Sequence, residues 1–416
     1  MLAGGRGGML RGLARRFAGN RVLLWVCLVI AVNQLGFGII VPVTPLYART
    51  FGVSEAAIGL VVAIYGLGRF LFSAPVGHAA DRFGRKRTIF AGTVLTCLGS
   101  VLCGLATDFT QLLVYRFIAG IGSTTVITGT QIVVADVATR ENRGRLMSTY
   151  QGFFAFAVGV GPSIGGVVAV LWGPRAPFFV FGVLTVVAGV LALTQLPETM
   201  HRTAEVSTAS SLAFQTAPRG VVRQLLTSAG FLTVSLVTLQ AAFNRTGAIF
   251  SVVPLMGVER IGLDPAAIGA ALTAGNMLNL AMIVAAGVLV DRYGRKPVIV
   301  PSCLLLAAAF VGFAFTPHYV GFALSAILWG VGTALGGATA AYAADQAPPG
   351  GNGVTMGIYR MLSDAGYVMG PLLLGVVAER AGAQAALLTA AGIAMGAMVP
   401  FALLAPETRR SARPSG

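Results

Sequence analysis

The chain has 416 residues, of which 56% are hydrophobic and only 10% are charged. A soluble domain usually carries about 25% charged residues, so this composition excludes a water-soluble globular protein and indicates a helical membrane protein. The net charge of +15 comes from 29 basic and 14 acidic residues. In a membrane protein such an excess is a topology signal, and we expect no nucleic-acid partner.

Twelve apolar runs are long enough to span a bilayer at about 20 residues per helix. They cover 22–48, 55–80, 88–106, 109–137, 146–171, 177–196, 226–256, 265–290, 298–315, 319–345, 354–378 and 384–404. We predict an all-α polytopic membrane protein of two pseudo-symmetric six-helix bundles. Its parts are a basic cytoplasmic tail over 1–21, bundles over 22–196 and 226–404, a cytoplasmic linker over 197–225 and a cytoplasmic tail over 405–416.

An internal repeat supports the two bundles. The segment GHAADRFGRKR at 77–87 recurs as GVLVDRYGRKP at 287–297, an offset of 287 − 77 = 210 residues. The Pro-Glu-Thr triplet at 197–199 recurs at 406–408, an offset of 209. Two halves of six spans that run in the same direction imply a pseudo-twofold axis along the membrane normal.

The basic residues also orient the chain. If both ends are cytoplasmic, the cytoplasmic loops and tails hold 21 Lys and Arg residues, and the opposite loops hold four. This bias predicts a multi-pass protein of the cell's inner (plasma) membrane with both termini in the cytoplasm. The basic amino end could also start a targeting peptide, but the run after it is longer than a signal sequence needs.

The two repeated segments, which we call the hinges, lie between the second and third spans of each half. Topology requires positive charge there, but it does not require an Asp and two Gly residues in a fixed frame. We therefore predict that the hinges gate the cytoplasmic side, against the alternative that they only fix topology. The predicted gating residues are Gly77, Asp81, Arg82, Gly84, Arg85, Lys86 and Asp136, and their counterparts Gly287, Asp291, Arg292, Gly294, Arg295, Lys296 and Asp345.

Two charged residues lie deep inside spans. Arg116 is about seven residues, or roughly 10 Å, into its span, and Asp364 is about ten residues, or roughly 15 Å, into its own. A charged side chain inside the membrane costs free energy, so each of these two residues is a candidate functional site. We predict that Asp364 carries a coupling proton and that Arg360, one helical turn away, modulates it. The alternatives are a static Arg360–Asp364 ion pair and an Arg116 that only bonds backbone carbonyls.

The intramembrane arginines outnumber the single deep acid, which favours anionic, zwitterionic or neutral amphipathic substrates over cations. Intramembrane amides could hydrogen-bond such a substrate, although each is equally able to bridge helices. The predicted substrate-cavity residues are Asn33, Gln34, Arg69, Gln131, Gln240, Asn244, Arg245 and Asn276.

These motifs, over nearly the whole chain, resemble the major facilitator superfamily and its twelve-helix drug–proton antiporters. The residues that carry the resemblance are the two hinges, Arg116 with Gly120 and Gly122, the helix 5 motif of Gly161, Pro162, Gly165 and Gly166, and the helix 1 segment 36–42. The resemblance implies that the hinges gate the inside, that Arg116 takes part in proton transfer and that the helix 5 motif blocks leak. Small residues there also let helices pack closely, and Pro162 bends the helix. Many cation exporters of this subfamily have an acid in helix 1, where this chain has Asn33 and Gln34.

We therefore predict a secondary active transporter, a proton-coupled exporter of small organic molecules or drugs that works by alternating access. The alternative is a facilitator or symporter of an organic anion or other metabolite. We expect a monomer whose partners are its substrate, protons and the bilayer, with no metal and no cofactor. An enzyme would need a catalytic constellation and a receptor a soluble sensing domain, and neither is evident; the histidines at 78, 201 and 318 form no cluster.

Overall fold

The computed structural model describes residues 21–139, 142–199, 220–348 and 351–407, and these form helices and short connections without a strand. Both predicted tails, apart from a few residues, and most of the predicted linker lie outside the described residues. The first half consists of α2 (Arg21–Ile40), α3 (Thr44–Arg49), α4 (Glu55–Phe83), α5 (Arg85–Leu105), α6 (Phe109–Asp136), α7 (Arg143–Trp172) and α8 (Ala176–Gln195). The second half consists of α10 (Val221–Thr227), α11 (Ala229–Asn244), the π-helix η2 (Arg245–Val252), α12 (Val253–Ile261), α13 (Pro265–Tyr293), α14 (Lys296–Phe315), α15 (Tyr319–Gly336), α16 (Ala338–Asp345) and α17 (Asn352–Leu404).

Within the described residues, eleven helical segments are long and apolar enough to cross a membrane. The last of them has 52 residues, or roughly 78 Å at 1.5 Å per residue, more than twice the hydrocarbon thickness. Gly382 interrupts α17 with a non-helical backbone (φ 84°, ψ 161°), a conformation that favours glycine. The segment therefore supplies two spans, and the twelve predicted spans are confirmed. The predicted linker boundary at 225 falls inside α10.

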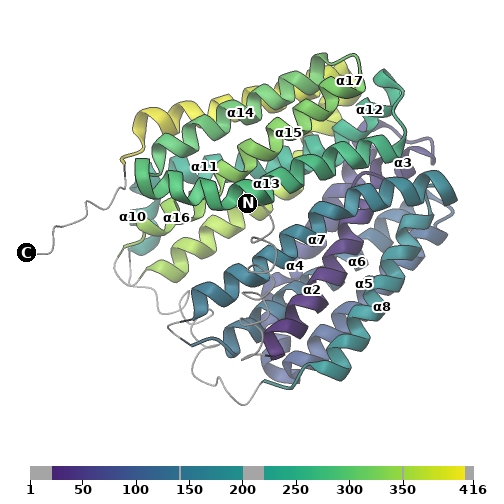
Figure 1. Ribbon diagram of the computed structural model, residues 1–416, viewed down its shortest axis with the longest axis horizontal. Helices are drawn as coiled ribbons and strands as arrows, with labels where there is room; N and C mark the ends of the chain where they lie inside the picture. Colours follow the sequence, from purple (N-terminus) through teal and green to yellow (C-terminus); the bar gives the residue numbers. More distant parts are fainter. Residues whose placement is uncertain (1–20, 140–141, 200–219, 349–350, 408–416) are drawn as a thin grey trace, which may run out of the picture.

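The two halves lie side by side, with α7 packed against α13 and α4 against α17 (Figure 1). Backbone meets backbone at these contacts. A Cβ at Gly166 would clash with the carbonyl of Pro265, and one at Gly269 would clash with the carbonyl of Pro162. Small residues let helices approach closely where lipid offers no hydrophobic driving force between them.

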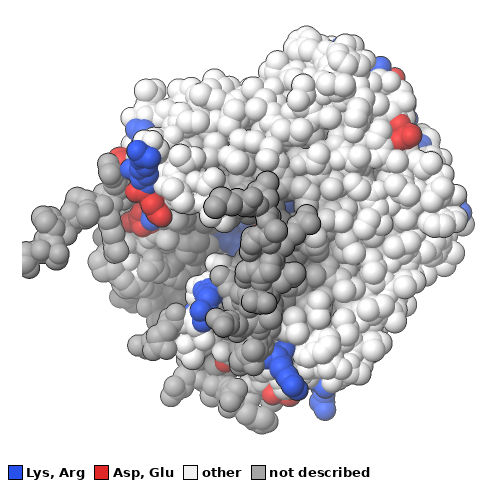
Figure 2. Space-filling model, viewed as in Figure 1, with Lys and Arg blue, Asp and Glu red and all other residues white. Residues whose placement is uncertain are grey.

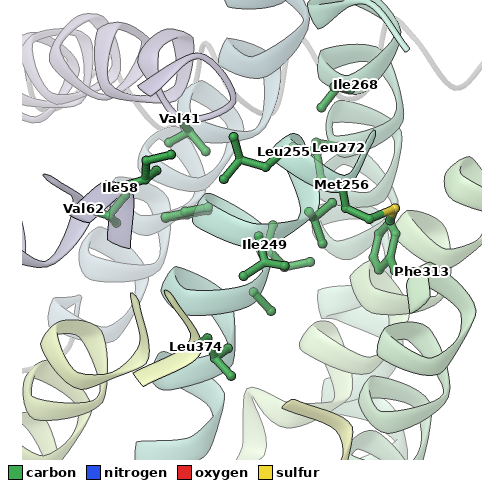
Figure 3. Packing of buried hydrophobic residues seen from close by; sticks show 14 of the residues in the cluster. Val41, Ile58, Val62, Ile249, Leu255, Met256, Ile268, Leu272, Phe313 and Leu374 are labelled. Carbon is green, nitrogen blue, oxygen red and sulfur yellow. The ribbon is translucent and has the colours of Figure 1, made fainter. Parts of the chain in front are cut away.

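The hydrophobic cores differ between the two ends of the molecule. We call the end that carries the hinges the hinge end and the opposite end the far end. Toward the far end, one cluster draws residues from both halves, including Val41 and Ile58 from the first and Leu255 and Leu272 from the second (Figure 3). At the hinge end, one cluster lies wholly in the first half and two lie wholly in the second. The halves are therefore joined at the far end and have separate cores at the hinge end.

Charged residues are also distributed along the direction from the hinge end to the far end. Figure 2 shows Lys, Arg, Asp and Glu side chains near the two ends of the molecule and a nearly uncharged surface between them, as expected where lipid surrounds the helices. The same view shows a hollow between the two halves with basic side-chain atoms inside it.

Candidate functional site

The first hinge is a buried ion-pair cluster. The guanidinium of Arg85 lies 3.2 Å from Asp136 and 2.9 Å from Asp81, and it donates a 2.8 Å hydrogen bond to the carbonyl of Ala80. The side chains of Arg85 and Asp136 are 2% and 4% exposed. A buried cation needs such partners, because a charge left unpaired in the interior is strongly destabilising.

The second hinge repeats this arrangement with fewer contacts and more solvent. Arg295 pairs with Asp345 and donates to the carbonyl of Ala341. The side chains of the pair are 24% and 34% exposed. Among the described residues Asp291, the counterpart of Asp81, makes no ion pair.

The Pro-Glu-Thr triplets cap the helices that follow the hinges. The carboxylate of Glu198 accepts hydrogen bonds from the backbone N–H of Arg85 at 2.8 Å and of Lys86 at 3.3 Å. The carboxylate of Glu407 accepts from Arg295 at 3.1 Å and Lys296 at 3.2 Å. Both acids thus satisfy free N–H groups at a helix N-terminus and complement the helix dipole.

Of the other hinge residues, Arg82 and Arg292 are exposed and Gly84 and Gly294 are buried. The guanidiniums of Arg82 and Arg292 each lie 5.3 Å from the ring centre of the next residue, an aromatic in both hinges. A Cβ at Gly77 or Gly287 would meet no atom within 4 Å, so the interface helices α4 and α13 are not closely packed there. Gly84 and Gly294 turn the chain, both at φ 95°. The bonds described above for each hinge all join residues of the same half.

Contacts between the halves concentrate at the far end. Arg49 forms an ion pair with Glu259 of the second half. Glu379 accepts a 3.1 Å hydrogen bond from the backbone N–H of Ala56 in the first turn of α4. The backbone N–H of Ser163 donates to the hydroxyl of Thr273 at 3.0 Å.

The predicted antiporter motif lies in this joined region. Gly161 and Gly165 of α7 face the backbone of α2, at Gly38 and Ile39. Their neighbours Pro162 and Gly166 pack on α13, as described above. The motif therefore forms close helix contacts within the first half and between the halves.

The two deep charges differ in their surroundings. Asp364 is half-buried and interacts electrostatically with Arg69 from the first half and with Arg360 from its own helix. Among the described residues it makes no ion pair with either, so the static Arg360–Asp364 pair is not present in this conformation. The Arg69 guanidinium lies 5.2 Å from the ring centre of Tyr367, one turn beyond Asp364. Asp364 thus has an arginine from each half in its surroundings, Arg69 and Arg360.

Arg116 is 3% exposed. Its Nε donates to the carbonyl of Val61 at 3.5 Å, and its guanidinium lies 4.5 Å from the ring centre of Tyr65. It lines a small cavity of about 10 Å³ together with Phe37, Phe250 and other residues. In this conformation Arg116 therefore lies between a backbone carbonyl and an aromatic ring beside that cavity.

A larger cavity, which we call the C-half recess, lies among α11, α14, α15, α16 and α17 and has a volume of about 250 Å³. Its wall includes Gln240, Asn244 and Arg245, three of the residues predicted for a substrate cavity. It also includes Trp329 and Tyr359, to which the sequence did not point. Tyr359, Ser363 and Tyr367 are spaced four residues apart on α17. This polar helical face is the signal in the sequence that could have identified Tyr359.

The other predicted cavity residues are dispersed. Asn33 and Gln34 are buried and hydrogen-bond each other at 3.1 Å. Asn276 shares a cavity of about 10 Å³ with Arg245 between the halves. Gln131 is half-buried in α6.

Comparison with known proteins agrees with this architecture. The family model described as Major Facilitator Superfamily matches residues 26–264 and 234–416. Multidrug resistance protein 2 of Bacillus subtilis is 25% identical over 355 residues, which cover 84% of this chain and 86% of that protein. The quinolone resistance protein NorA of Staphylococcus aureus is 25% identical over 248 residues, 59% of this chain and 61% of that protein.

Among solved structures, a bacterial homologue of the human lysosomal transporter Spinster, in an inward-facing and occupied conformation, superposes with a TM-score of 0.77. The alignment covers 92% of this chain and 96% of that one at 17% identity, which shows the fold. Since the family match spans most of the chain and the fold agrees, the chain belongs to the Major Facilitator Superfamily and is a secondary transporter of small molecules, not an enzyme.

Proposed function

We propose that this chain is a proton-coupled exporter of small organic molecules that works by alternating access. It acts as a monomer in the cell's inner (plasma) membrane, with both termini in the cytoplasm. The excess of basic residues at the hinge end supports this orientation.

The joined far end and the separate cores at the hinge end support an inward-facing state of the transport cycle. In the outward-facing state the far-end contacts of Arg49 and Glu379 would break, and the hinges would approach the other half. Rocking of two rigid bundles around a midplane site is the usual mechanism of this architecture.

The observation that carries the proposal is the position of Asp364. It lies 364 − 352 = 12 residues from the start of α17 and 382 − 364 = 18 residues from the break at Gly382. Of the acidic residues described, it alone lies that far from both ends of its span. A nearby guanidinium favours a charged carboxylate. Movement of Arg69 relative to Asp364 as the halves rock would therefore couple proton release to the conformational change.

The test is transport in proteoliposomes with Asp364→Asn. We expect this variant to lose transport driven by a pH gradient and to keep exchange of substrate across the membrane. Asp264→Asn is the matched control, because Asp264 caps α13 outside the membrane core and Asn is an equally good cap. Proton-driven transport that persists in Asp364→Asn would refute the assignment of the coupling proton.

A second candidate, uptake or facilitated movement of an organic anion, is favoured by the mid-span arginines at positions 69, 116, 245 and 360. The direction of proton movement separates the two. Substrate moving against protons changes the pH of the vesicle lumen in the opposite sense from substrate moving with them.

A further inference from the structure

The C-half recess meets the space between the two halves at Arg245 and Tyr367. Arg245 also lines the small cavity that includes Pro162 of the first half, and Tyr367 also lines the one that includes Arg116. Arg245 lies at the centre of its span, because 245 − 229 = 16 residues separate it from one end and 261 − 245 = 16 from the other. It is nevertheless an exposed residue, and the space that it borders includes the recess and the cavity between the halves.

Arg245 forms no ion pair with a carboxylate among the described residues. The deep acid Asp364 interacts electrostatically with Arg69 and Arg360, which are two of the other mid-span arginines. The groups that act electrostatically on Arg245 are Tyr367 and Arg69, and Arg69 carries the same charge. A cation in the middle of a membrane is costly and marks a functional site, so an accessible arginine there without an acid indicates a place for an anion.

Most hydroxyl groups in the wall of the recess already donate their hydrogen to the protein. Thr238, Ser302 and Thr333 donate to backbone carbonyls at 3.0, 2.6 and 2.8 Å. Thr339 donates to a backbone carbonyl at 3.0 Å, so its 2.9 Å contact with the hydroxyl of Tyr359 uses the hydrogen of Tyr359. These five groups are therefore left as acceptors, and an anion that enters the recess depends on the guanidinium for its donors.

The rest of the wall indicates the size and shape of the ligand. Phe310, Trp329 and Tyr359 contribute aromatic rings, which favour a flat aromatic body. The volume of about 250 Å³ lies below the roughly 300–1,000 Å³ of drug-sized pockets. Arg245 is the single charged side chain among the described lining residues, so it neutralises one negative charge. A carboxylate matches the fork of a guanidinium, whereas an amine would meet a like charge.

The recess is a departure from the internal repeat. Thr339 and Tyr359 correspond to Thr130 and Tyr150 at an offset of 209, and the hydroxyls of Thr130 and Tyr150 are also 2.9 Å apart. In the first half both residues are 0% exposed, whereas in the second half their counterparts line the recess. The helix of the second half also breaks at Gly337, where α15 gives way to α16. Irregular backbone at membrane depth is tolerated where it lines a cavity.

We propose that the C-half recess binds small aromatic carboxylates, with the carboxylate paired to the guanidinium of Arg245 and the ring among Phe310, Trp329 and Tyr359. The inference rests on the proposed function, because it names the substrate class of the same transporter. It assigns charge selection to one of the four mid-span arginines. It concerns binding within the second bundle, which can be measured without transport.

The chain supplies its own reporter. Its three tryptophans are Trp25, Trp172 and Trp329, and Trp329 alone of the three lines the recess. The purified Trp25→Phe, Trp172→Phe protein in detergent is titrated with 4-nitrobenzoate, whose nitro group quenches tryptophan fluorescence, while the emission of Trp329 is recorded. The matched control retains Trp172 alone, which is 70% exposed, and corrects for light absorbed by the probe and for its uptake by micelles.

We expect saturable quenching of Trp329 by 4-nitrobenzoate. The neutral isostere 4-nitrobenzamide and the cation 4-nitrobenzylammonium should each bind more weakly by roughly ten-fold or more, because hydrogen bonds between two charged groups are the strong ones. This comparison of three ligands needs no substitution in the recess.

Arg245→Gln should raise the Kd for 4-nitrobenzoate by roughly ten-fold or more and change that for 4-nitrobenzamide by less than about three-fold. A general loss of structure would weaken both ligands alike. Arg223→Gln, the same change at an exposed arginine of α10 outside the recess, should alter neither Kd.

Equal affinity for 4-nitrobenzoate and 4-nitrobenzamide would overturn the proposal, as would an equal loss of both ligands in Arg245→Gln. Absence of Trp329 quenching while proteoliposomes still show proton-driven transport would also overturn it and leave the proposed function standing. Binding with the expected charge selectivity, in a protein that shows no proton-coupled transport, would support the binding site and refute the proposed function alone.

Discussion

The two hinges share a frame of Gly, Asp-Arg, an aromatic residue and Gly-Arg-Lys, but the surroundings of this frame differ. In the first, Arg85 is 2% exposed and bonds two carboxylates and a carbonyl. In the second, Arg295 is 24% exposed and bonds one carboxylate and a carbonyl. The repeat thus reproduces the position of the charges, whereas packing decides how strongly they are held. We infer that the first hinge is a fixed structural unit and that the second is freer to exchange partners.

The largest expected difference in stability between the hinges comes from removing the charge of the acids that pair with these arginines, Asp136 and Asp345. Asp136→Asn leaves the buried guanidinium of Arg85 with Asp81 as its single charged partner among the described residues. Removal of one member of a buried ion pair costs roughly 3–5 kcal/mol, and since Asp81 remains we expect the free energy of unfolding to fall by about 2 kcal/mol. Asp345→Asn should lower it by less than about 1 kcal/mol, as for solvent-exposed pairs.

Both free energies can be measured by denaturant titration in mixed micelles. Asp108→Asn at the far end is a suitable control, because Asp108 caps α6 and Asn preserves the cap. Equal losses for Asp136→Asn and Asp345→Asn would contradict the inferred difference between the hinges.

The sequence was sufficient for the fold because membrane spans are long apolar runs. It also placed Asp136 and Asp345 among the predicted gating residues, and the structure pairs Asp136 with Arg85 and Asp345 with Arg295, each within its own half. It did not predict the caps, because Glu198 lies more than one hundred residues from Arg85 in the chain.

The candidate substrate cavity was harder to predict than the fold. Asn33 and Gln240 are both intramembrane amides, and helical spacing does not distinguish a buried pair from an amide that lines a recess. The π-helix that starts at Arg245 changes the helical phase at that point, so a regular 3.6-residue period could not assign the side chains around it.

The caps should show no such difference between the halves. Glu198 and Glu407 bond the same two backbone positions at similar distances. Glu198→Ala and Glu407→Ala should each cost about 1 kcal/mol, the usual value of an N-terminal cap. Faster hydrogen exchange in the first turn of α5 or α14 would report each loss. If only Glu198→Ala had an effect, the difference between the hinges would extend to the caps and would not belong to the arginines alone.

The smallest effect on stability is expected at the first acids of the hinges. Asp81 lies 2.9 Å from Arg85, but its side chain is 39% exposed, so Asp81→Asn should cost less than about 0.5 kcal/mol. Asp291→Asn, where no described ion pair is lost, should have no measurable effect. If the hinges are gates, both changes should nevertheless slow transport, because these acids would find partners in the other half only in the outward-facing state. If the hinges only fix topology, transport rates should follow stability and remain near those of the unaltered protein. Transport rates measured on variants of equal stability therefore separate a gate from a topology signal.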